Sequence, residues 1–248
     1  MSRVSLAGVS VDFPLYHARA RSMRRFALAG ALGRSLDLER RHPTVAALRH
    51  VDLAIADGER LALLGSNGAG KTTLLRTIAG VYRPTAGVVR CDGRVTPLLS
   101  LGMGLNPAAT GRQNIVFIAV HLGIAPARIR PRLDEIVEWT ELGAFIEAPV
   151  ATYSSGMIAR LAFAVSTCFP PEILLLDEWL GLADPAFQVK AYERMAAFVG
   201  GASVVVLASQ STALLELWCN RAVRLEAGRL VDSGSVAEVA ARAAGGTA

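Results

Sequence analysis

Cysteine is scarce in this sequence. The three cysteines, Cys91, Cys168 and Cys219, lie far apart among 248 residues and show no CxxC or Cys/His spacing. Neither a disulfide framework nor a zinc site is therefore indicated, and a reducing compartment is the simplest setting for the chain.

Hydrophobic runs that are long enough to cross a bilayer are also missing. One of the longest apolar stretches, IVFIAVHLGIA at 115–125, is well short of the roughly 20 residues that a membrane-spanning helix needs. The first residues lack the pattern of a signal peptide. We therefore expect that the chain neither spans a membrane nor is secreted by that route.

Acidic residues are few in the stretch where basic residues gather. Segment 17–43 has seven arginines against Asp37 and Glu39, so its formal charge of +5 equals the net charge of the whole chain. Three interpretations stay open for this basic insertion: a solvated surface arm, contact with anionic lipid headgroups, and contact with an acidic loop of a partner. Nucleic acid is not an expected partner, because Phe26 is the one aromatic residue among these arginines and no recognition-helix pattern follows.

The pattern of apolar segments predicts an α/β fold, with a mostly parallel sheet and helices on both faces. Segments 3–13 and 45–56 are expected to form an N-terminal antiparallel layer. Other strands are expected at 60–65, near 87–91, at 173–177 and at 203–208, and helices from Gly70, at 185–199 and after Ser211. A hairpin that turns at Ala227 and Gly228 and a helix from Ser235, with Glu238 in a capping box, complete the predicted fold.

The middle of the sequence is rich in helix-forming segments. Helices are expected at 113–122, at 127–142 and after a Ser-Ser-Gly turn, the last of them ending before Pro170 and Pro171. We interpret about 98–170 as a helical subdomain inserted into a single domain that spans 1–248.

The stretch GSNGAGKTT at 65–73 fits the phosphate-loop pattern G-x-x-x-x-G-K-[ST], and it follows an apolar strand and opens a helix. Its glycines let backbone N–H groups close around the phosphates of a nucleotide. Lys71 would reach the β- and γ-phosphates, and Thr72 would bind Mg²⁺. The expected nucleotide-binding residues are Gly65, Ser66, Asn67, Gly68, Ala69, Gly70, Lys71, Thr72 and Thr73.

The stretch EILLLDEWL at 172–180 is an apolar strand that ends in two carboxylates. Asp177 follows a parallel strand, where ligands bind in open α/β sheets, and it can hold magnesium through water. Glu178 can orient and polarise the water that attacks the γ-phosphate.

Ser154, Ser155 and Gly156 form the turn that precedes the third helix of the middle segment. The first N–H groups of a helix lack partners within the helix, and small residues allow an anion to come close. The turn is therefore a second candidate phosphate site, far along the chain from the phosphate loop.

This order of motifs resembles the ATP-binding subunit of ABC transporters over about residues 1–235, including GLADPAF with Asp184 as the D-loop. The resemblance implies a P-loop NTPase of ABC type that binds ATP and Mg²⁺ and hydrolyses ATP as a homodimer. In that family the signature turn acts in trans, so Ser154 and Gly156 would contact the ATP held by the other subunit. The resemblance also implies two integral-membrane permease subunits and a peripheral position on the cytoplasmic side of the inner membrane.

The turn reads YSSGM where the family typically has LSGGQ, and LLSLGMGLNPAATGRQNI at 98–115 replaces the usual glutamine loop, with Gln113 too late to fill it. Both variants resemble the branch that exports lipid-linked polysaccharides such as O-antigen, capsule or teichoic acid. A transporter of another cargo is one alternative. A soluble ABC ATPase of DNA repair or translation is less favoured, because a second nucleotide domain and a coiled-coil insertion are absent from the sequence.

Two further roles follow from the resemblance. The aromatic residue that stacks on adenine would be Phe13 or Tyr16, and either could instead pack in the core. Gln210 stands where the family usually has a catalytic histidine that contacts the γ-phosphate. Gln210 either slows hydrolysis or substitutes adequately for that histidine.

Overall fold

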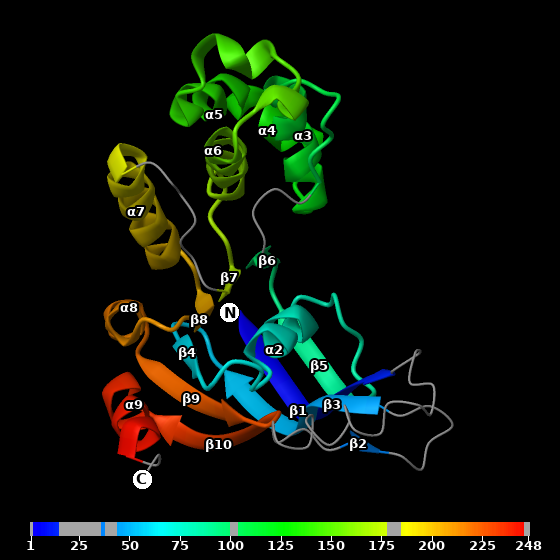
Figure 1. The fold of residues 1–248 in the computed structure, drawn as a ribbon, viewed down its shortest axis with the longest axis vertical. Coiled ribbons are helices and arrows are strands. Elements are labelled where there is room, and N and C mark those ends of the chain that lie inside the picture. The colour runs from blue at the N-terminus through cyan, green and yellow to red at the C-terminus, as the bar shows by residue number, and fades with distance from the viewer. Residues whose placement is uncertain (1, 15–35, 38–43, 100–103, 178–184, 246–248) are drawn as a thin grey trace, which may run out of the picture. The chain divides into compact units, whose positions relative to one another are not determined.

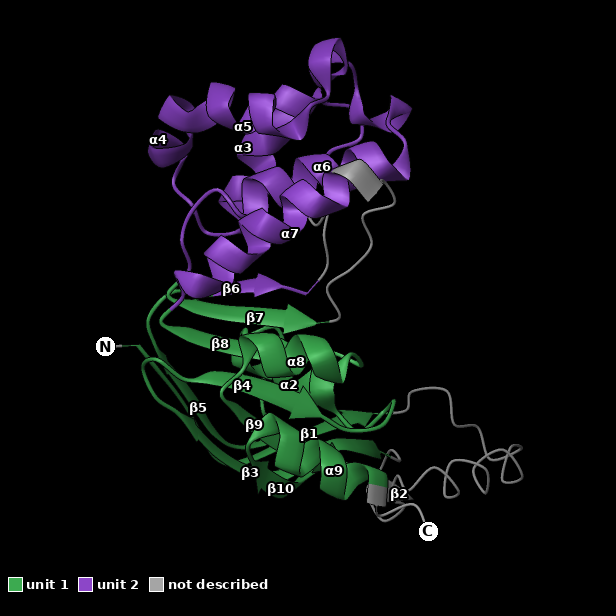
Figure 2. Ribbon diagram, turned by 90° about the vertical axis from the view of Figure 1, so that its left-hand side faces the viewer, with its two compact units in different colours: residues 1–95, 172–178, 203–248 green, residues 96–171, 179–202 purple. Residues whose placement is uncertain are grey.

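The computed structural model describes residues 2–14, 36–37, 44–99, 104–177 and 185–245 (Figure 1). Their contacts separate two compact units, shown in green and purple in Figure 2. Unit 1 comprises 1–95, 172–178 and 203–248, and unit 2 comprises 96–171 and 179–202. In the described part of the chain, no helix combines the length and the apolar character that crossing a membrane requires.

The first sheet of unit 1 is antiparallel, with the strand order β2-β3-β1-β5. Its strands are β1 (Arg3–Pro14), β2 (Leu36–Asp37), β3 (Thr44–Ile55) and β5 (Ala86–Asp92). Alternate residues such as Val4 and Leu6 are buried, as expected for strands with one face on the core. The predicted N-terminal antiparallel layer is confirmed, and β5 is added to its edge.

The second sheet of unit 1 is mostly parallel, in the order β10-β9-β4-β8-β7. Its strands are β4 (Arg60–Leu64), β7 (Ile173–Asp177), β8 (Val204–Ala208), β9 (Arg221–Glu226) and the antiparallel β10 (Arg229–Gly234). All five residues of β8 are buried, which is typical of parallel sheets covered on both faces. The predicted strands at 60–65, 173–177 and 203–208 are confirmed.

The helices of unit 1 are α2 (Lys71–Ile78), α8 (Thr212–Trp218) and α9 (Val236–Gly245). The predicted hairpin turns at Ala227 and Gly228, both with positive φ. The predicted capping box of α9 is also present, because the Ser235 N–H donates to Glu238 and the Glu238 N–H donates to the Ser235 hydroxyl.

Unit 2 is helical. It contains α3 (Gly111–His121), α4 (Pro126–Ile129), α5 (Leu133–Thr140), α6 (Ser155–Ser166) and α7 (Pro185–Gly200), with 3-10 turns at Arg130–Arg132, Gly143–Glu147 and Val150–Thr152. Trp139 packs between Phe163 and Phe187, at ring-centroid distances of 5.4 and 5.1 Å, and so joins α5, α6 and α7. Ile115, Ile136 and other apolar residues form a core between the helices.

One prediction about the elements was wrong, and one strand was missed. The single helix expected at 127–142 is divided into α4, a 3-10 turn and α5, because Pro131 has no N–H and its ring does not fit inside an α-helix. The short strand β6 (Val95–Leu98), which spans the boundary between the units, was not predicted, since Pro97 disfavours a strand.

Candidate functional site

The loop between β4 and α2 has the backbone of an anion-binding loop. Gly65, Gly68 and Gly70 have φ values of 146°, 79° and 115°. A Cβ atom on Gly65 would lie 2.4 Å from the Leu225 carbonyl oxygen, and one on Gly70 would lie 2.8 Å from that of Ala47. Both conformation and space therefore require glycine at positions 65 and 70, and conformation favours it at position 68.

Lys71 is held over this loop. Its Nζ donates to the carbonyl oxygens of Gly65 and Ser66, at 2.6 and 3.1 Å. The loop is also fixed from outside, because the Gly228 N–H donates to the Ala69 carbonyl at 2.9 Å. A cation and the N-terminus of α2 thus lie at one place, which favours binding of a polyphosphate.

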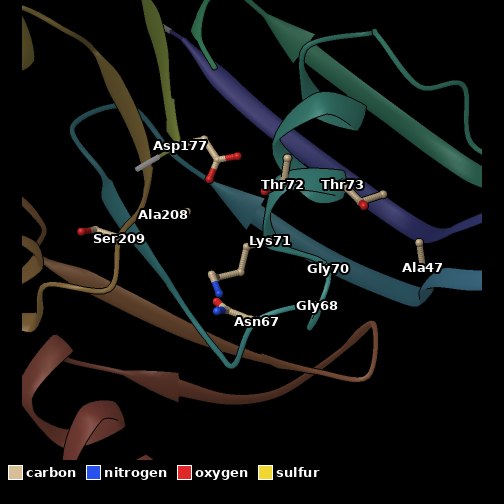
Figure 3. Close-up of a pocket in the computed structure, with 10 residues that line it drawn as sticks. All are labelled: Ala47, Asn67, Gly68, Gly70, Lys71, Thr72, Thr73, Asp177, Ala208 and Ser209. Atoms are coloured by element: carbon tan, nitrogen blue, oxygen red, sulfur yellow. The ribbon is translucent and has the colours of Figure 1, made fainter. Parts of the chain in front are cut away.

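A cavity of about 240 Å³ opens at this loop, and Figure 3 shows the side chains around it. The carboxyl ends of β7 and β8 contribute Asp177 and Ala208, which are paired in register. Thr72, in the first turn of α2, supplies a hydroxyl to the same cavity. The described lining residues are Ala47, Asn67, Gly68, Gly70, Lys71, Thr72, Thr73, Asp177, Ala208 and Ser209.

The structure thus brings Asp177 to the phosphate loop, more than 100 positions away in the sequence. Hydroxyl and carboxylate oxygens are ligands that Mg²⁺ prefers. Ala47, Ala208 and Ser209 line the cavity but were missed by the sequence analysis. Ser209 directly follows the apolar strand β8, and Asp177 is the last residue of β7. The rule that ligands bind at the carboxyl ends of parallel strands could therefore have identified Ser209 as well. Ala47 carries no comparable signal.

Other predicted residues are placed differently. Gln210 is exposed and is not among the described residues that line the cavity. The Phe13 ring is half-buried and packs edge-on against the ring of Tyr82, with the ring centroids 5.0 Å apart. Glu178, Asp184 and Tyr16 lie outside the described residues.

The signature turn belongs to unit 2. Ser154 caps α6, because its hydroxyl accepts a hydrogen bond from the Met157 N–H at 3.2 Å. Ser154 and Ser155 are exposed. A Cβ atom on Gly156 would meet no atom of the described residues nearer than 3.8 Å, and the φ of Gly156 is not positive. In the part of the chain that the structure describes, neither space nor conformation therefore requires a glycine at position 156.

Comparison with protein-family models gives a match to residues 48–181, for the family described as ABC transporter. The chain belongs to this family. It is an ABC ATPase and binds ATP, as the sequence analysis predicted. The predicted fold class is confirmed as well.

Among curated proteins, this ABC ATPase is 39% identical to the O-antigen export system ATP-binding protein RfbE of Yersinia enterocolitica, over 94% of the chain and 98% of that protein. It is 42% identical to RfbB of Myxococcus xanthus, an O-antigen export system ATP-binding protein, over 79% of the chain and 45% of that protein. It is 38% identical to the teichoic acids export ATP-binding protein TagH of Enterococcus faecalis, over 76% of the chain and 42% of that protein. The predicted resemblance to the polysaccharide-exporter branch is confirmed.

Solved structures show the same fold at low identity. An ATP-binding subunit of an ABC transporter matches with a TM-score of 0.69 and 20% identity, over 99% of this chain and 95% of the other. A dimeric ATP-binding cassette in a post-hydrolysis state with ADP and Pi matches with a TM-score of 0.67 and 19% identity, over 94% and 98% of the two chains.

Proposed function

We propose that this chain is the ATP-hydrolysing subunit of an exporter that moves a lipid-linked polysaccharide, of O-antigen, capsule or teichoic-acid type, across the cytoplasmic membrane. The observation that carries the cargo class is the 39% identity to an O-antigen export ATP-binding protein along nearly the full length of both chains. The subunit would work as a homodimer under two integral-membrane permease subunits, attached to the cytoplasmic side of the membrane. Residues 1–248 would form one ATP-binding domain, with the helical subdomain inserted at about 98–170.

ATP would place its β- and γ-phosphates in the loop 65–73, against Lys71. The residues of the cavity fit a magnesium ion, because the Thr72 hydroxyl and the Asp177 carboxylate line it together. Mg²⁺, when bound, would neutralise part of the phosphate charge. Glu178, directly after Asp177 in the sequence, would orient the attacking water, and Asp184 would contribute from the D-loop.

The signature residues Ser154, Ser155 and Gly156 would contact the ATP of the second subunit. Gly156 supports this proposal, because among the described residues no atom lies closer than 3.8 Å to a Cβ atom built on it, so a side chain would find space there. A phosphate that approaches from another molecule gives a physical reason for the missing side chain. The exposure of Ser154 and Ser155 is consistent with such an approach.

The test is a mixing experiment with two variants that break different halves of a shared site. Lys71→Ala removes the phosphate-loop cation, and Ser154→Arg blocks the signature turn. We expect each variant to be inactive alone and the mixture to regain ATP hydrolysis, since one site of each heterodimer combines an intact loop with an intact turn.

The control for this experiment mixes Lys71→Ala with the double variant that carries both changes, because that heterodimer has no intact site. If cross-linking shows heterodimers of the two single variants but hydrolysis does not return, the shared site is wrong.

A further inference from the structure

Tyr153, the residue before the signature turn, is held at its hydroxyl. The residue is buried, and its hydroxyl donates to the Phe145 carbonyl oxygen at 2.6 Å. Burial raises the pKa of the phenol, so the hydroxyl remains a donor at neutral pH. This hydrogen bond connects the residue before Ser154 to the 3-10 turn at Gly143–Glu147.

The same hydroxyl lies against Gly111, the first residue of α3. A Cβ atom on Gly111 would lie 2.2 Å from the Tyr153 hydroxyl oxygen and 2.9 Å from Cδ1 of Ile146. The φ of Gly111 is not positive, so close packing explains this glycine without any backbone strain. Two segments that the sequence analysis singled out separately, TGRQN and YSSGM, therefore meet in one contact.

The backbones of these two segments are also bonded to each other. The Val150 N–H donates to the Ala109 carbonyl and the Ala151 N–H to the Pro107 carbonyl, each at 2.9 Å. Thr110 forms an antiparallel bridge with Pro149. The loop before α3 and the chain that leads into the signature turn thus run side by side.

Asn114 fixes the other side of the loop. Its side chain is fully buried, accepts from the Asn106 N–H at 2.7 Å, and donates to the carbonyl oxygens of Asn106, Ala109 and Thr110 at 2.9 to 3.2 Å. Segments 106–114 and 145–153 therefore form one hydrogen-bonded body, and Ser154 follows directly after it.

We propose that Tyr153 is a positioning residue for the signature turn, and that through Gly111 it makes Ser154 move as one body with the loop 106–110. This inference rests on the proposed function, in which Ser154 contacts the ATP of a second chain. A displaced turn requires the Tyr153 hydroxyl to leave both Phe145 and Gly111. The contact therefore limits the orientations that Ser154 samples before a phosphate arrives, and such limits matter because misplaced groups lose transition-state contacts steeply.

The test is Tyr153→Phe, which removes a single oxygen atom from the contact. We expect kcat for ATP hydrolysis to fall about three- to thirtyfold, while the affinity of the chain for ATP stays unchanged because the phosphate loop is not touched. The matched control is Thr152→Val. The Thr152 hydroxyl also bonds a carbonyl, that of Pro149 at 2.7 Å, but the residue is exposed and its bond stays within its own 3-10 turn. Thr152→Val is expected to keep the starting kcat.

Ser154→Arg, measured beside these variants, separates the possible failures. If Ser154→Arg is inactive but Tyr153→Phe keeps the full kcat, the positioning role is wrong and the proposed function stands. If Ser154→Arg keeps full activity, the role of the turn in the proposed function is wrong, and the positioning role falls with it. A parallel loss of ATP affinity in Tyr153→Phe, beyond that of Thr152→Val, would show a general structural defect and overturn the inference.

Discussion

Gln210 lies just beyond β8, which ends at Ala208. The resemblance to ABC ATPases implies that Gln210 stands where that family usually has a histidine, which contacts the γ-phosphate and helps to hold the attacking water. A glutamine can donate to phosphate and accept from water, but it cannot become cationic as charge develops. In this structure Gln210 is exposed, while its neighbour Ser209 lines the cavity.

Gln210→His is therefore expected to speed single-turnover ATP hydrolysis, by about ten- to a thousandfold if the glutamine costs roughly 1.4–4 kcal/mol of transition-state stabilisation. ATP affinity should change little, because the phosphate loop and Lys71 are intact. Rate and affinity are to be measured in the same preparation. A histidine variant that is no faster would show that Gln210 substitutes adequately.

At the residue scale, the site residues that could be predicted from the sequence are those whose identity is fixed by the local backbone conformation. The residues of loop 65–73 could be predicted because Gly65 and Gly70 adopt conformations and contacts that glycine alone tolerates. The loop and Asp177 meet as predicted, since ends of parallel strands share one edge of a sheet. Ala47 was out of reach, because its place in the cavity depends on the approach of a different sheet and on no property of alanine.

At the scale of one element, the start of α3 depends on Asn114. Its buried side chain makes hydrogen bonds to the backbone of Asn106, Ala109 and Thr110. Asn114→Ala would leave the Asn106 N–H and the nearby carbonyl groups without this partner. We expect a loss of about 2–4 kcal/mol in the free energy of unfolding, measured by urea denaturation.

The matched control is Gln113→Ala, on the same helix. Gln113 is exposed and completes the capping box by accepting from the Thr110 N–H at 3.0 Å, so its removal should cost about 0.5–1 kcal/mol. Equal losses in the two variants would contradict the assigned role of Asn114. The capping role also accounts for Gln113, which the sequence analysis found too late in the chain for a glutamine loop.

Elements were predicted well where the signal was an apolar run, and poorly where proline intervened. The buried strands β4, β7 and β8 each have the short, continuous apolar sequence that parallel strands require. Pro131 divides the expected helix at 127–142, and Pro97 hid β6. The meeting of TGRQN with YSSGM was not predicted, because it depends on tertiary contacts between helices that the sequence pattern does not encode.

At the scale of the whole molecule, the two candidate phosphate-binding features belong to different units. The phosphate loop follows a sheet strand of unit 1, and a side chain in place of Gly65 or Gly70 would clash with backbone carbonyl oxygens. The signature turn leads into α6 in unit 2, and among the described residues no atom lies closer than 3.8 Å to a Cβ atom built on Gly156. The glycines of the phosphate loop are thus explained by contacts within the chain, whereas for Gly156 we propose a phosphate that approaches from a second subunit.

The charge of the whole molecule leads to the last prediction. Segment 17–43 has a formal charge of +5, and the rest of the chain sums to zero. Attraction to anionic lipid should therefore depend on this segment, at about 1 kcal/mol for each arginine near the surface at moderate salt. We expect the purified chain to co-sediment with vesicles that contain anionic lipid more than with neutral ones, and the difference to shrink as salt shortens the Debye length.

Replacing Arg24, Arg25, Arg40 and Arg41 with glutamine should weaken this binding at least about tenfold. The matched control replaces the exposed Arg3, Arg83, Arg90 and Arg229, which lowers the net charge equally from outside the segment. Equal binding to both kinds of vesicle would remove the lipid interpretation, and equal losses in the two quadruple variants would assign the attraction to net charge alone.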